Sequence, residues 1–224
     1  MNAPTGLLIF DCDGVLVDSE QLSMRAYKDV LGANAIAIDD GLWAQCVGLK
    51  QDDIFTRIER AKGREIGPEL RARIWPRVQE LFRSELEATP GLTAFLDALS
   101  GPPCVASSSS PERIALSLEV TGLAKYFGER VYSTQLVKRG KPAPDIFLYA
   151  AAKAGVPPAR CVVIEDSPYG VAGALEATMR AVGYIGGAHA APGQKDKLLA
   201  AGASFVARDW SEVADWFAKC PVSA

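Results

Sequence analysis

The sequence predicts an α/β protein whose doubly wound parallel sheet is interrupted once by an inserted helical domain. The main observation is that short apolar runs, bounded by turn residues, alternate with helical patterns along most of the 224-residue chain. Strands separated by helices need crossover connections, which make neighbouring strands parallel. The second observation is that one interval, after the first apolar run, has helical periodicity and no convincing strand. A chain of this length can bury the interior of both parts.

Six apolar runs are the expected strands of the sheet. They are Leu7–Phe10, Cys104–Ser107, Val131–Ser133, Cys161–Ile164, Arg180–Gly183 and Ser204–Ala207. The helices between them carry start and stop signals. The pattern over Pro144–Ala154, for example, begins with Pro-Asp and is followed by Gly155 and a Pro-Pro pair. We therefore expect residues 1–18 and 89–224 to form one α/β core.

The interval from Ser19 to about Ala88 is the expected insertion. One helical face in it is apolar and comprises Leu70, Ile74, Val78, Leu81 and Phe82. Pro76 falls inside this pattern and should kink or divide the helix. We expect residues 19–88 to fold as a separate helical domain, after which the chain re-enters the core near Pro90.

Charge and composition argue against several classes of protein. The chain has 24 basic and 27 acidic residues, whereas a general nucleic-acid or acidic-membrane binder would carry a basic excess. No stretch is long and apolar enough to span a membrane, and no basic region precedes Leu7 as a secretory signal would require. Five cysteines without C-x-x-C spacing are typical of reduced core residues in a cytoplasmic protein. We expect a monomer or weak dimer, with neither nucleic acid nor membrane as a partner.

Two carboxylates follow the first strand directly, in Asp11-Cys12-Asp13-Gly14. Alternation along an extended chain puts Asp11 and Asp13 on one side, at the carboxyl end of the strand, where open parallel sheets bind ligands. Two close carboxylates repel each other, and a hard cation such as Mg²⁺ is the usual remedy. Gly14 allows a tight turn beside a ligand. Taken alone, the motif also fits a solvated acidic turn.

A run of serines ends the second expected strand and precedes a helix start. Ser110 fits the N-cap position and Pro111 the first helical position. The N–H groups and hydroxyls there, with those of Ser107 and Ser108, favour an anion. The alternative is that the serines only cap the helix.

A lysine follows the third expected strand, in a loop that Gly140 and Pro142 restrict. The ammonium group of Lys141, held in this way, can neutralise both a phosphate and an attacking carboxylate. A solvated loop lysine is the alternative interpretation.

A second pair of carboxylates, Glu165 and Asp166, follows the fourth apolar run. If this strand lies beside the first, Asp166 completes a metal site with Asp11 and Asp13. The alternative is that both carboxylates are charges at a helix N-terminus, where the helix dipole favours them. All four motifs lie at a strand end or in the loop after one, which favours a single site.

The four motifs together resemble the signature motifs of the haloacid dehalogenase superfamily. In chain order they are Asp11-x-Asp13-Gly14, Ser107, Lys141 and Glu165-Asp166. The chain is similar over nearly its whole length to the branch with a helical cap after the first motif, which includes β-phosphoglucomutase and small sugar-phosphate phosphatases. The resemblance implies a Rossmann-like core, a cap over residues 19–88, and hydrolysis of a small sugar phosphate or sugar-acid phosphate.

The resemblance also implies a role for each catalytic residue. Asp11 would attack phosphorus and form an aspartyl-phosphate, which water opens in a second, easier step. Asp13 would protonate the leaving alkoxide and then activate that water. Ser107 and Ser108, with neighbouring N–H groups, would hold the phosphoryl oxygens, and Lys141 would neutralise charge near Asp11.

The resemblance further implies Mg²⁺ as the cofactor. Its expected ligands are the carboxylates of Asp11 and Asp166 and the main-chain carbonyl of Asp13, with Glu165 nearby, bound directly or through water. The cation would offset the repulsion between a carboxylate nucleophile and an anionic substrate.

The family's substrate-reading cap loop matches residues 47–51, so Gly48, Lys50 and Gln51 are the expected substrate contacts. The mutase has an arginine at the position of Gln51. Either Lys50 replaces that charge or the substrate has no second anionic group; alternatively Lys50 is simply an exposed lysine between helices. Gly48 alternatively serves only to end a helix. The mutase also has a histidine where this chain has Ser23, which favours hydrolysis over mutase activity.

Three alternatives to a phosphatase stay open from the sequence. The nearest is a phosphosugar mutase, which would require a bisphosphate activator. A receiver-like signalling module also uses Mg²⁺, an aspartyl-phosphate, a hydroxyl and a lysine, but neither a nucleophile after the first strand nor an inserted cap suits it. A catalytically silent binding protein is the third. The natural substrate also stays open, because it depends on the geometry of the cap.

Overall fold

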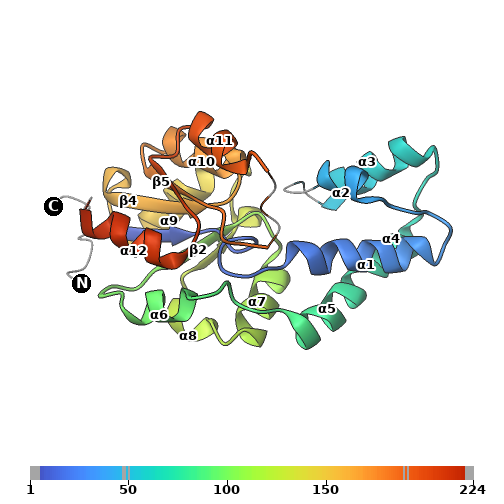
Figure 1. Cartoon of the computed structure of the whole chain (residues 1–224), viewed down its shortest axis with the longest axis horizontal. Coiled ribbons are helices and arrows are strands. Elements are labelled where there is room, and N and C mark those ends of the chain that lie inside the picture. The colour runs from blue at the N-terminus through green and yellow to red at the C-terminus, as the bar shows by residue number, and fades with distance from the viewer. Residues whose placement is uncertain (1–5, 47–48, 50, 189, 191, 220–224) are drawn as a thin grey trace. The chain divides into compact units, whose positions relative to one another are not determined.

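The computed structural model describes residues 6–46, 49, 51–188, 190 and 192–219. The chain divides into two compact units (Figure 1). One comprises Met1–Asp18 and Glu87–Ala224 and is called the sheet unit below; the other comprises Ser19–Leu86 and is called the helical unit.

Six parallel strands make up one sheet in the described part of the sheet unit. They are β1 (Leu7–Phe10), β2 (Cys104–Ser107), β3 (Val131–Ser133), β4 (Cys161–Glu165), β5 (Arg180–Tyr184) and β6 (Phe205–Ala207). Their order across the sheet is β3-β2-β1-β4-β5-β6. The predicted parallel α/β fold is confirmed, and the strand ends differ from the expected ones by a single residue in β4, β5 and β6.

The central strand β1 determines where the chemically important residues meet. Phe10 is in register with Val105 of β2 on one side and with Ile164 of β4 on the other. The strand order reverses at β1, and in open α/β sheets the crevice at such a reversal is where ligands bind. The residues that follow β1, β2 and β4 therefore emerge together at the carboxyl edge of the sheet.

Helices cover both faces of this sheet (Figure 1). In chain order they are α6 (Leu92–Asp97), α7 (Pro111–Val120), α8 (Ala124–Phe127), α9 (Asp145–Ala154), α10 (Pro168–Glu176), α11 (Gln194–Ala200) and α12 (Trp210–Lys219). Ile9 packs with the buried residues of α9, α10 and α11. Phe10, whose side chain alternates to the other face, contacts Phe95 of α6, Phe127 of α8 and Trp210 of α12, with ring centroids about 6 Å apart.

The helical unit contains five helices among its described residues. They are α1 (Glu20–Gly32), α2 (Asp40–Ala44), α3 (Gln51–Lys62), α4 (Pro68–Ala72) and α5 (Ile74–Glu85). The predicted division of the apolar helical pattern is observed at Arg73, between α4 and α5. Pro76 lies in the first turn of α5, where its missing N–H group costs no hydrogen bond within the helix. Tyr27 packs against Trp43 and Phe55 at the centre of this unit.

The two segments that connect the units are hydrogen-bonded to each other inside the sheet unit. The N–H group of Thr89 donates to the carbonyl of Leu16 (3.0 Å), and its hydroxyl donates to the carbonyl of Val15 (2.7 Å). The indole N–H of Trp210 in turn donates to the Thr89 hydroxyl (2.9 Å). The turn just after the first pair of carboxylates is thereby tied to the C-terminal helix, and Gly14 occupies it with φ at 78°.

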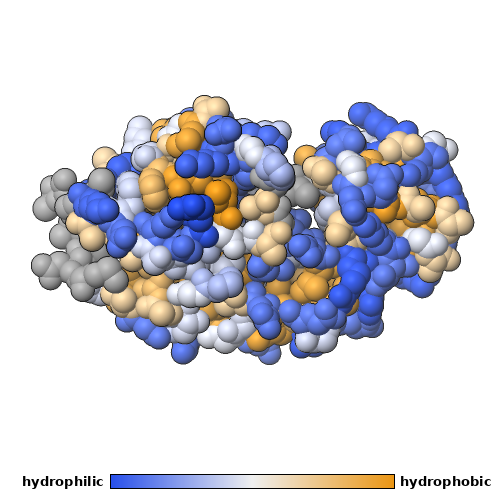
Figure 2. All heavy atoms as spheres, viewed as in Figure 1, coloured by the Kyte–Doolittle hydropathy of each residue, from blue (hydrophilic) through white to orange (hydrophobic). Residues whose placement is uncertain are grey.

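Hydrophilic residues predominate on the face that Figure 2 shows, in both units, with apolar residues in separate patches between them. Few large apolar side chains of the described residues are exposed; they are Leu136, Leu148, Tyr169, Leu175 and Leu199. None of the helices in the described part is long and apolar enough to cross a membrane.

Candidate active site

Asp11 is the first residue beyond β1, and the sheet itself determines its position. Its N–H group donates to the carbonyl of Ile164 in β4 (3.0 Å), which continues the ladder of the sheet past Phe10. The Asp11 side chain is buried. A carboxylate is therefore held at the carboxyl end of the central strand, where sequence analysis predicts the nucleophile.

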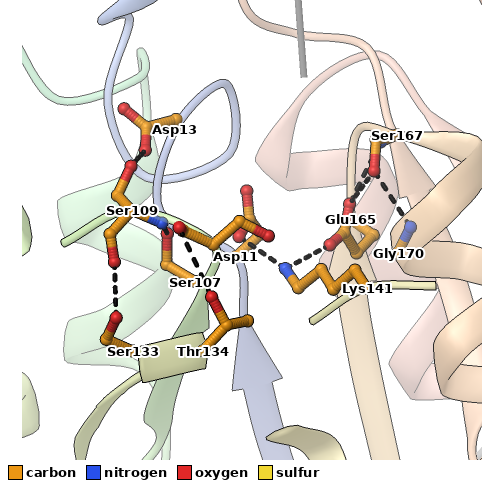
Figure 3. A network of polar contacts seen from close by, with 11 residues as sticks. Asp11, Asp13, Ser107, Ser109, Ser133, Thr134, Lys141, Glu165, Ser167 and Gly170 are labelled. Carbon is orange, nitrogen blue, oxygen red and sulfur yellow. Dashed lines mark hydrogen bonds and ion pairs between the residues drawn. The ribbon is translucent and has the colours of Figure 1, made fainter. Parts of the chain in front are cut away.

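Lys141 joins the first and fourth motifs (Figure 3). Its Nζ atom lies 2.7 Å from Oδ1 of Asp11 and 2.5 Å from Oε1 of Glu165. Its side chain is only 5% exposed, and Nζ lies 5.2 Å from the centre of the Phe147 ring. The predicted proximity of Lys141 to Asp11 is thus observed, whereas its contact with Glu165 was not anticipated.

Burial and neighbouring charge act in opposite directions on this lysine and its partner. Burial alone would lower the pKa of Lys141, but the Asp11 and Glu165 carboxylates outweigh burial and raise it. Burial also raises the pKa of Asp11 well above its usual value. Lys141 opposes that rise, while Glu165, Asp166 and Asp13 add to it. The described site therefore carries more negative charge than Lys141 alone can balance.

Glu165 is held at both carboxylate oxygens. Oε1 accepts from Lys141, and Oε2 accepts from the N–H group and the hydroxyl of Ser167, both at 3.0 Å. Ser167 is also the N-cap of α10, since its hydroxyl accepts from the N–H group of Gly170 (3.0 Å). Gly170 makes room for the glutamate, because a Cβ atom on it would lie 1.8 Å from Oε1 of Glu165.

Three carboxylates come close enough together to hold a cation. One oxygen each from Asp11, Glu165 and Asp166 lies within 4.8 Å of the other two. Oxygen-only ligands of this kind suit a hard divalent cation. Burial is the largest cause of the raised pKa of Asp11, and the carboxylates of Glu165 and Asp166 raise it further, which is negative charge that such a cation would offset. These three of the four expected metal residues are therefore brought together; a contribution from the main-chain carbonyl of Asp13 stays a prediction.

The Asp13 carboxylate makes a separate set of contacts. Its Oδ2 atom accepts from the Ser109 hydroxyl (2.6 Å, Figure 3), and its Oδ1 atom accepts from Nη2 (2.7 Å) and Nε (3.1 Å) of Arg113. Sequence analysis did not single out either partner. The signal that could have found them was the helix start at Pro111, which puts Arg113 in the first turn after the serine loop.

The serine loop between β2 and α7 is fixed by several hydrogen bonds. The buried Ser107 hydroxyl accepts from the N–H group of Ser109 (3.1 Å), and the Ser109 carbonyl accepts from the Ser133 hydroxyl (2.6 Å). Ser108 is exposed, and its carbonyl accepts from the Thr134 hydroxyl (3.4 Å). As predicted, Ser110 caps α7, since its hydroxyl accepts from the N–H group of Arg113 (3.3 Å).

The remaining predicted residues belong to the helical unit, lie outside the described part, or make no polar contact with the site. Gln51 is exposed at the first position of α3, while Gly48 and Lys50 lie outside the described residues. Ser23 is buried inside the helical unit and donates to the carbonyl of Ser19 (2.9 Å). Cys12 is buried as predicted, and burial raises the pKa of its thiol well above the usual value, which makes it unreactive.

Comparison with known proteins gives a consistent assignment. Residues 5–178 match the family of haloacid dehalogenase-like hydrolases. The chain is 29% identical to the 6-phosphogluconate phosphatase of Escherichia coli over 187 residues, which cover 83% of this chain and 85% of that one. It is 32% identical to the fructose-1-phosphate phosphatase of the same organism over 177 residues, 78% of this chain and 94% of the other.

A solved structure is similar over almost the whole chain. The crystal structure of a conserved haloacid dehalogenase-like protein of unknown function from Agrobacterium tumefaciens superposes with a TM-score of 0.84. The two sequences are 33% identical, and the match covers 96% of this chain and 98% of the other.

Proposed function

The chain belongs to the haloacid dehalogenase-like hydrolases and is a phosphatase, and from that premise we propose its route, its cation and its class of substrate. The route is attack of Asp11 on phosphorus to give an aspartyl-phosphate, which water then hydrolyses. The cation is Mg²⁺. The substrate is a small phosphorylated metabolite, a sugar phosphate or a sugar-acid phosphate.

The observation that carries the route is the enclosed ion pair between Asp11 and Lys141. A carboxylate that is buried at the end of the central strand and held by an equally buried ammonium group has one fixed orientation. The ammonium group also offsets the repulsion between Asp11 and an anionic phosphoryl group. These are the properties that a carboxylate nucleophile needs.

The proposed second carboxylate in the reaction is Asp13. It protonates the leaving alkoxide in the first step and takes a proton from the attacking water in the second. Ser107 and Ser108, with the N–H groups of the loop before α7, hold the phosphoryl oxygens. The well-fixed geometry of that loop supports this role, because donors that need no rearrangement stabilise a developing charge best.

The proposed Mg²⁺ ligands are the carboxylates of Asp11 and Asp166 and the main-chain carbonyl of Asp13, with Glu165 nearby, bound directly or through water. The clustering of the three carboxylates supports this assignment. When bound, Mg²⁺ supplies positive charge between the carboxylate nucleophile and the anionic substrate. The residues of the chain itself orient the nucleophile, hold the phosphoryl group and move the proton.

The class of substrate follows from the relatives, which act on 6-phosphogluconate and fructose 1-phosphate. We propose that Gly48, Lys50 and Gln51 contact the part of the substrate that does not react. The cytoplasmic location, the monomeric or weakly dimeric state and the absence of nucleic-acid or membrane partners stay predictions.

The test is phosphate release from a panel of phosphorylated sugars, sugar acids, polyols and glycolate, with Mg²⁺ or with EDTA. We expect the wild type to turn over a few members of the panel with Mg²⁺ only, and Asp11→Asn to be inactive. Rapid acid quenching during turnover should trap one phosphate on the peptide that contains Asp11.

Three results would contradict the proposal in different ways. Activity only in the presence of a bisphosphate activator would indicate the mutase. A stable phospho-Asp without turnover would indicate a signalling module. Undiminished activity in EDTA would show that the reaction does not need Mg²⁺.

A further inference from the structure

We propose that Arg113, assisted by Ser109, is the positioning residue for the acid–base carboxylate Asp13. This inference rests on the proposed function and adds a residue that the signature motifs do not contain. Arg113 is not proposed to touch the substrate; it acts by fixing the orientation of the Asp13 side chain.

Donors hold Asp13 at both of its carboxylate oxygens. Oδ1 accepts two hydrogen bonds from Arg113, from Nη2 at 2.7 Å and from Nε at 3.1 Å, and Oδ2 accepts one from the Ser109 hydroxyl at 2.6 Å. Because donors engage both oxygens from different directions, neither torsion of the aspartate side chain can turn freely. The ion pair is also sheltered, since the side chains of Arg113 and Asp13 are only 20% and 15% exposed.

The two donors are themselves held in place. Arg113 lies in the first turn of α7, where its N–H group is bound by the N-cap Ser110. Ser109 is fixed from below, because its N–H group donates to Ser107 and its carbonyl accepts from Ser133 (Figure 3). A site works well when the groups that orient a catalytic side chain are locked by their own hydrogen bonds.

Each carboxylate of the first motif therefore has its own cation. Lys141, in the loop before α9, holds Asp11 at 2.7 Å, and Arg113, in α7, holds Asp13 at 2.7 Å. The two carboxylates consequently do not compete for one positive charge. This separation suits two different roles, a nucleophile that stays beside the phosphoryl group and an acid that faces the leaving oxygen.

The proposed reaction changes the protonation of Asp13, and Arg113 stabilises its deprotonated form. In the first step the bond from phosphorus to the leaving oxygen breaks, the bond from phosphorus to Asp11 forms, and the proton of Asp13 moves to the alkoxide. The Asp13 carboxylate that results is the species that Arg113 and Ser109 hold by hydrogen bonds. In the second step that carboxylate takes a proton from the attacking water as the water oxygen bonds to phosphorus. The bond from phosphorus to Asp11 breaks, inorganic phosphate leaves, and Asp11 is again a free carboxylate while Asp13 is again protonated for the next substrate.

The test compares leaving groups. An alkyl phosphate needs protonation as its alkoxide leaves, whereas p-nitrophenyl phosphate releases a stable phenolate that does not. The quantity to compare is kcat/KM, because it covers the steps up to departure of the leaving group. Arg113→Met keeps the aliphatic stem but removes the hydrogen bonds, and Arg113→Lys restores the charge without the paired donors.

We expect Arg113→Met to lower kcat/KM for the alkyl phosphate by about 10- to 100-fold, mostly through kcat, since correct proton transfer contributes about 10²- to 10⁴-fold. The loss for p-nitrophenyl phosphate should be under about 3-fold, and Arg113→Lys should be intermediate. The matched control is Arg208→Met, which breaks the ion pair to Glu212 at a surface site where Arg208 is 75% exposed. It should leave both rates unchanged.

A double variant separates positioning from the alternatives. If Arg113 acts through Asp13, then Asp13→Asn with Arg113→Met should be no slower than Asp13→Asn alone. Two outcomes would overturn the proposal. One is a double variant whose loss of kcat/KM is the product of the losses in the two single variants, and the other is an equal loss of kcat/KM for both leaving groups in Arg113→Met. Either would indicate contact of Arg113 with the substrate or a folding defect. Thermal unfolding shows whether Arg113→Met is folded. If it is not, Ser109→Ala replaces it in the test: this variant removes the donor to Oδ2 of Asp13 and must lower kcat/KM more for the alkyl phosphate than for p-nitrophenyl phosphate. A wild type inactive on both substrates would instead contradict the proposed function.

Discussion

Lys141 and Asp11 form an ion pair that is almost completely enclosed: Nζ lies 2.7 Å from Oδ1, and the two side chains are 5% and 11% exposed. The pair joins residues 130 positions apart in the sequence. Its energetics differ from those of a surface ion pair, because removal of one partner leaves the other charged and out of contact with water.

Replacing Lys141 by Met should therefore lower both stability and activity. We expect the free energy of unfolding to fall by about 3 kcal/mol in EDTA, because Asp11 and Glu165 lose their shared cation. The double variant with Asp11→Asn should recover part of that loss, since it removes one of the unpaired carboxylates. Urea unfolding followed by circular dichroism measures the stability of the single and the double variant. Equal stability of the two would show that the charges of Lys141 and Asp11 are not coupled.

Gly170→Ala should damage the site even though alanine favours helices. The added Cβ would lie 1.8 Å from Oε1 and 1.9 Å from Cδ of Glu165, so the glutamate must move and Lys141 loses one of its partners. We expect kcat to fall at least about 10-fold, whereas helix propensity alone would add about 1 kcal/mol of stability. Gly32→Ala, in α1 with open space around it, is the matched control and should keep full activity. A kcat in Gly170→Ala equal to that of the wild type would show that the site does not need the space that Gly170 leaves for Glu165.

Glu165 and Asp166 should differ in their effect on Mg²⁺. Both oxygens of Glu165 are already engaged by Lys141 and Ser167. We therefore expect Asp166→Asn to raise the Mg²⁺ concentration for half-maximal activity by at least about 10-fold, and Glu165→Gln to lower kcat with a smaller change in that concentration. Titration of activity with free Mg²⁺ distinguishes the two variants. An equal rise in the Mg²⁺ concentration for half-maximal activity would indicate that Glu165 binds the cation as directly as Asp166 does.

Tyr184 should make the protein sensitive to alkaline pH. Burial raises the pKa of its hydroxyl to about 12, so the folded state favours the neutral form relative to an unfolded chain with a pKa of about 10. The stabilisation is fully present below pH 10 and is lost as the pH rises from 10 to 12. Between pH 8 and 11 the wild type should lose about 1.4 kcal/mol that Tyr184→Phe does not lose.

Urea unfolding at the two pH values measures this difference. Tyr169→Phe is the control, because it removes the same hydroxyl from an exposed side chain. The same pH dependence in Tyr184→Phe as in the wild type would assign the alkaline loss of stability to other groups.

Local patterns in the sequence were sufficient for the fold and for most of the site. The apolar runs predict all six strands of the described sheet, because a strand buried on both faces must be continuously apolar. Asp11, Lys141, Glu165 and Asp166 could be singled out because each ends a strand, directly follows one or lies in the loop after one. The parallel order of the strands then brings such positions to one edge of the sheet.

Other features depend on contacts between distant segments, and only the tertiary structure decided them. Arg113 reaches Asp13 across 100 positions of sequence. The helix start at Pro111 marks Arg113 as a first-turn residue after the serine loop, but no local pattern pairs it with Asp13. Two further features could not be predicted from the fourth motif. One is the contact between Lys141 and Glu165, and the other is the space that Gly170 leaves for the Glu165 side chain. Strand ends and caps are set by short-range sterics and hydrogen bonding, which the sequence displays directly. The partners of a side chain depend on how helices pack on the sheet, and that packing exists only once the whole chain has folded.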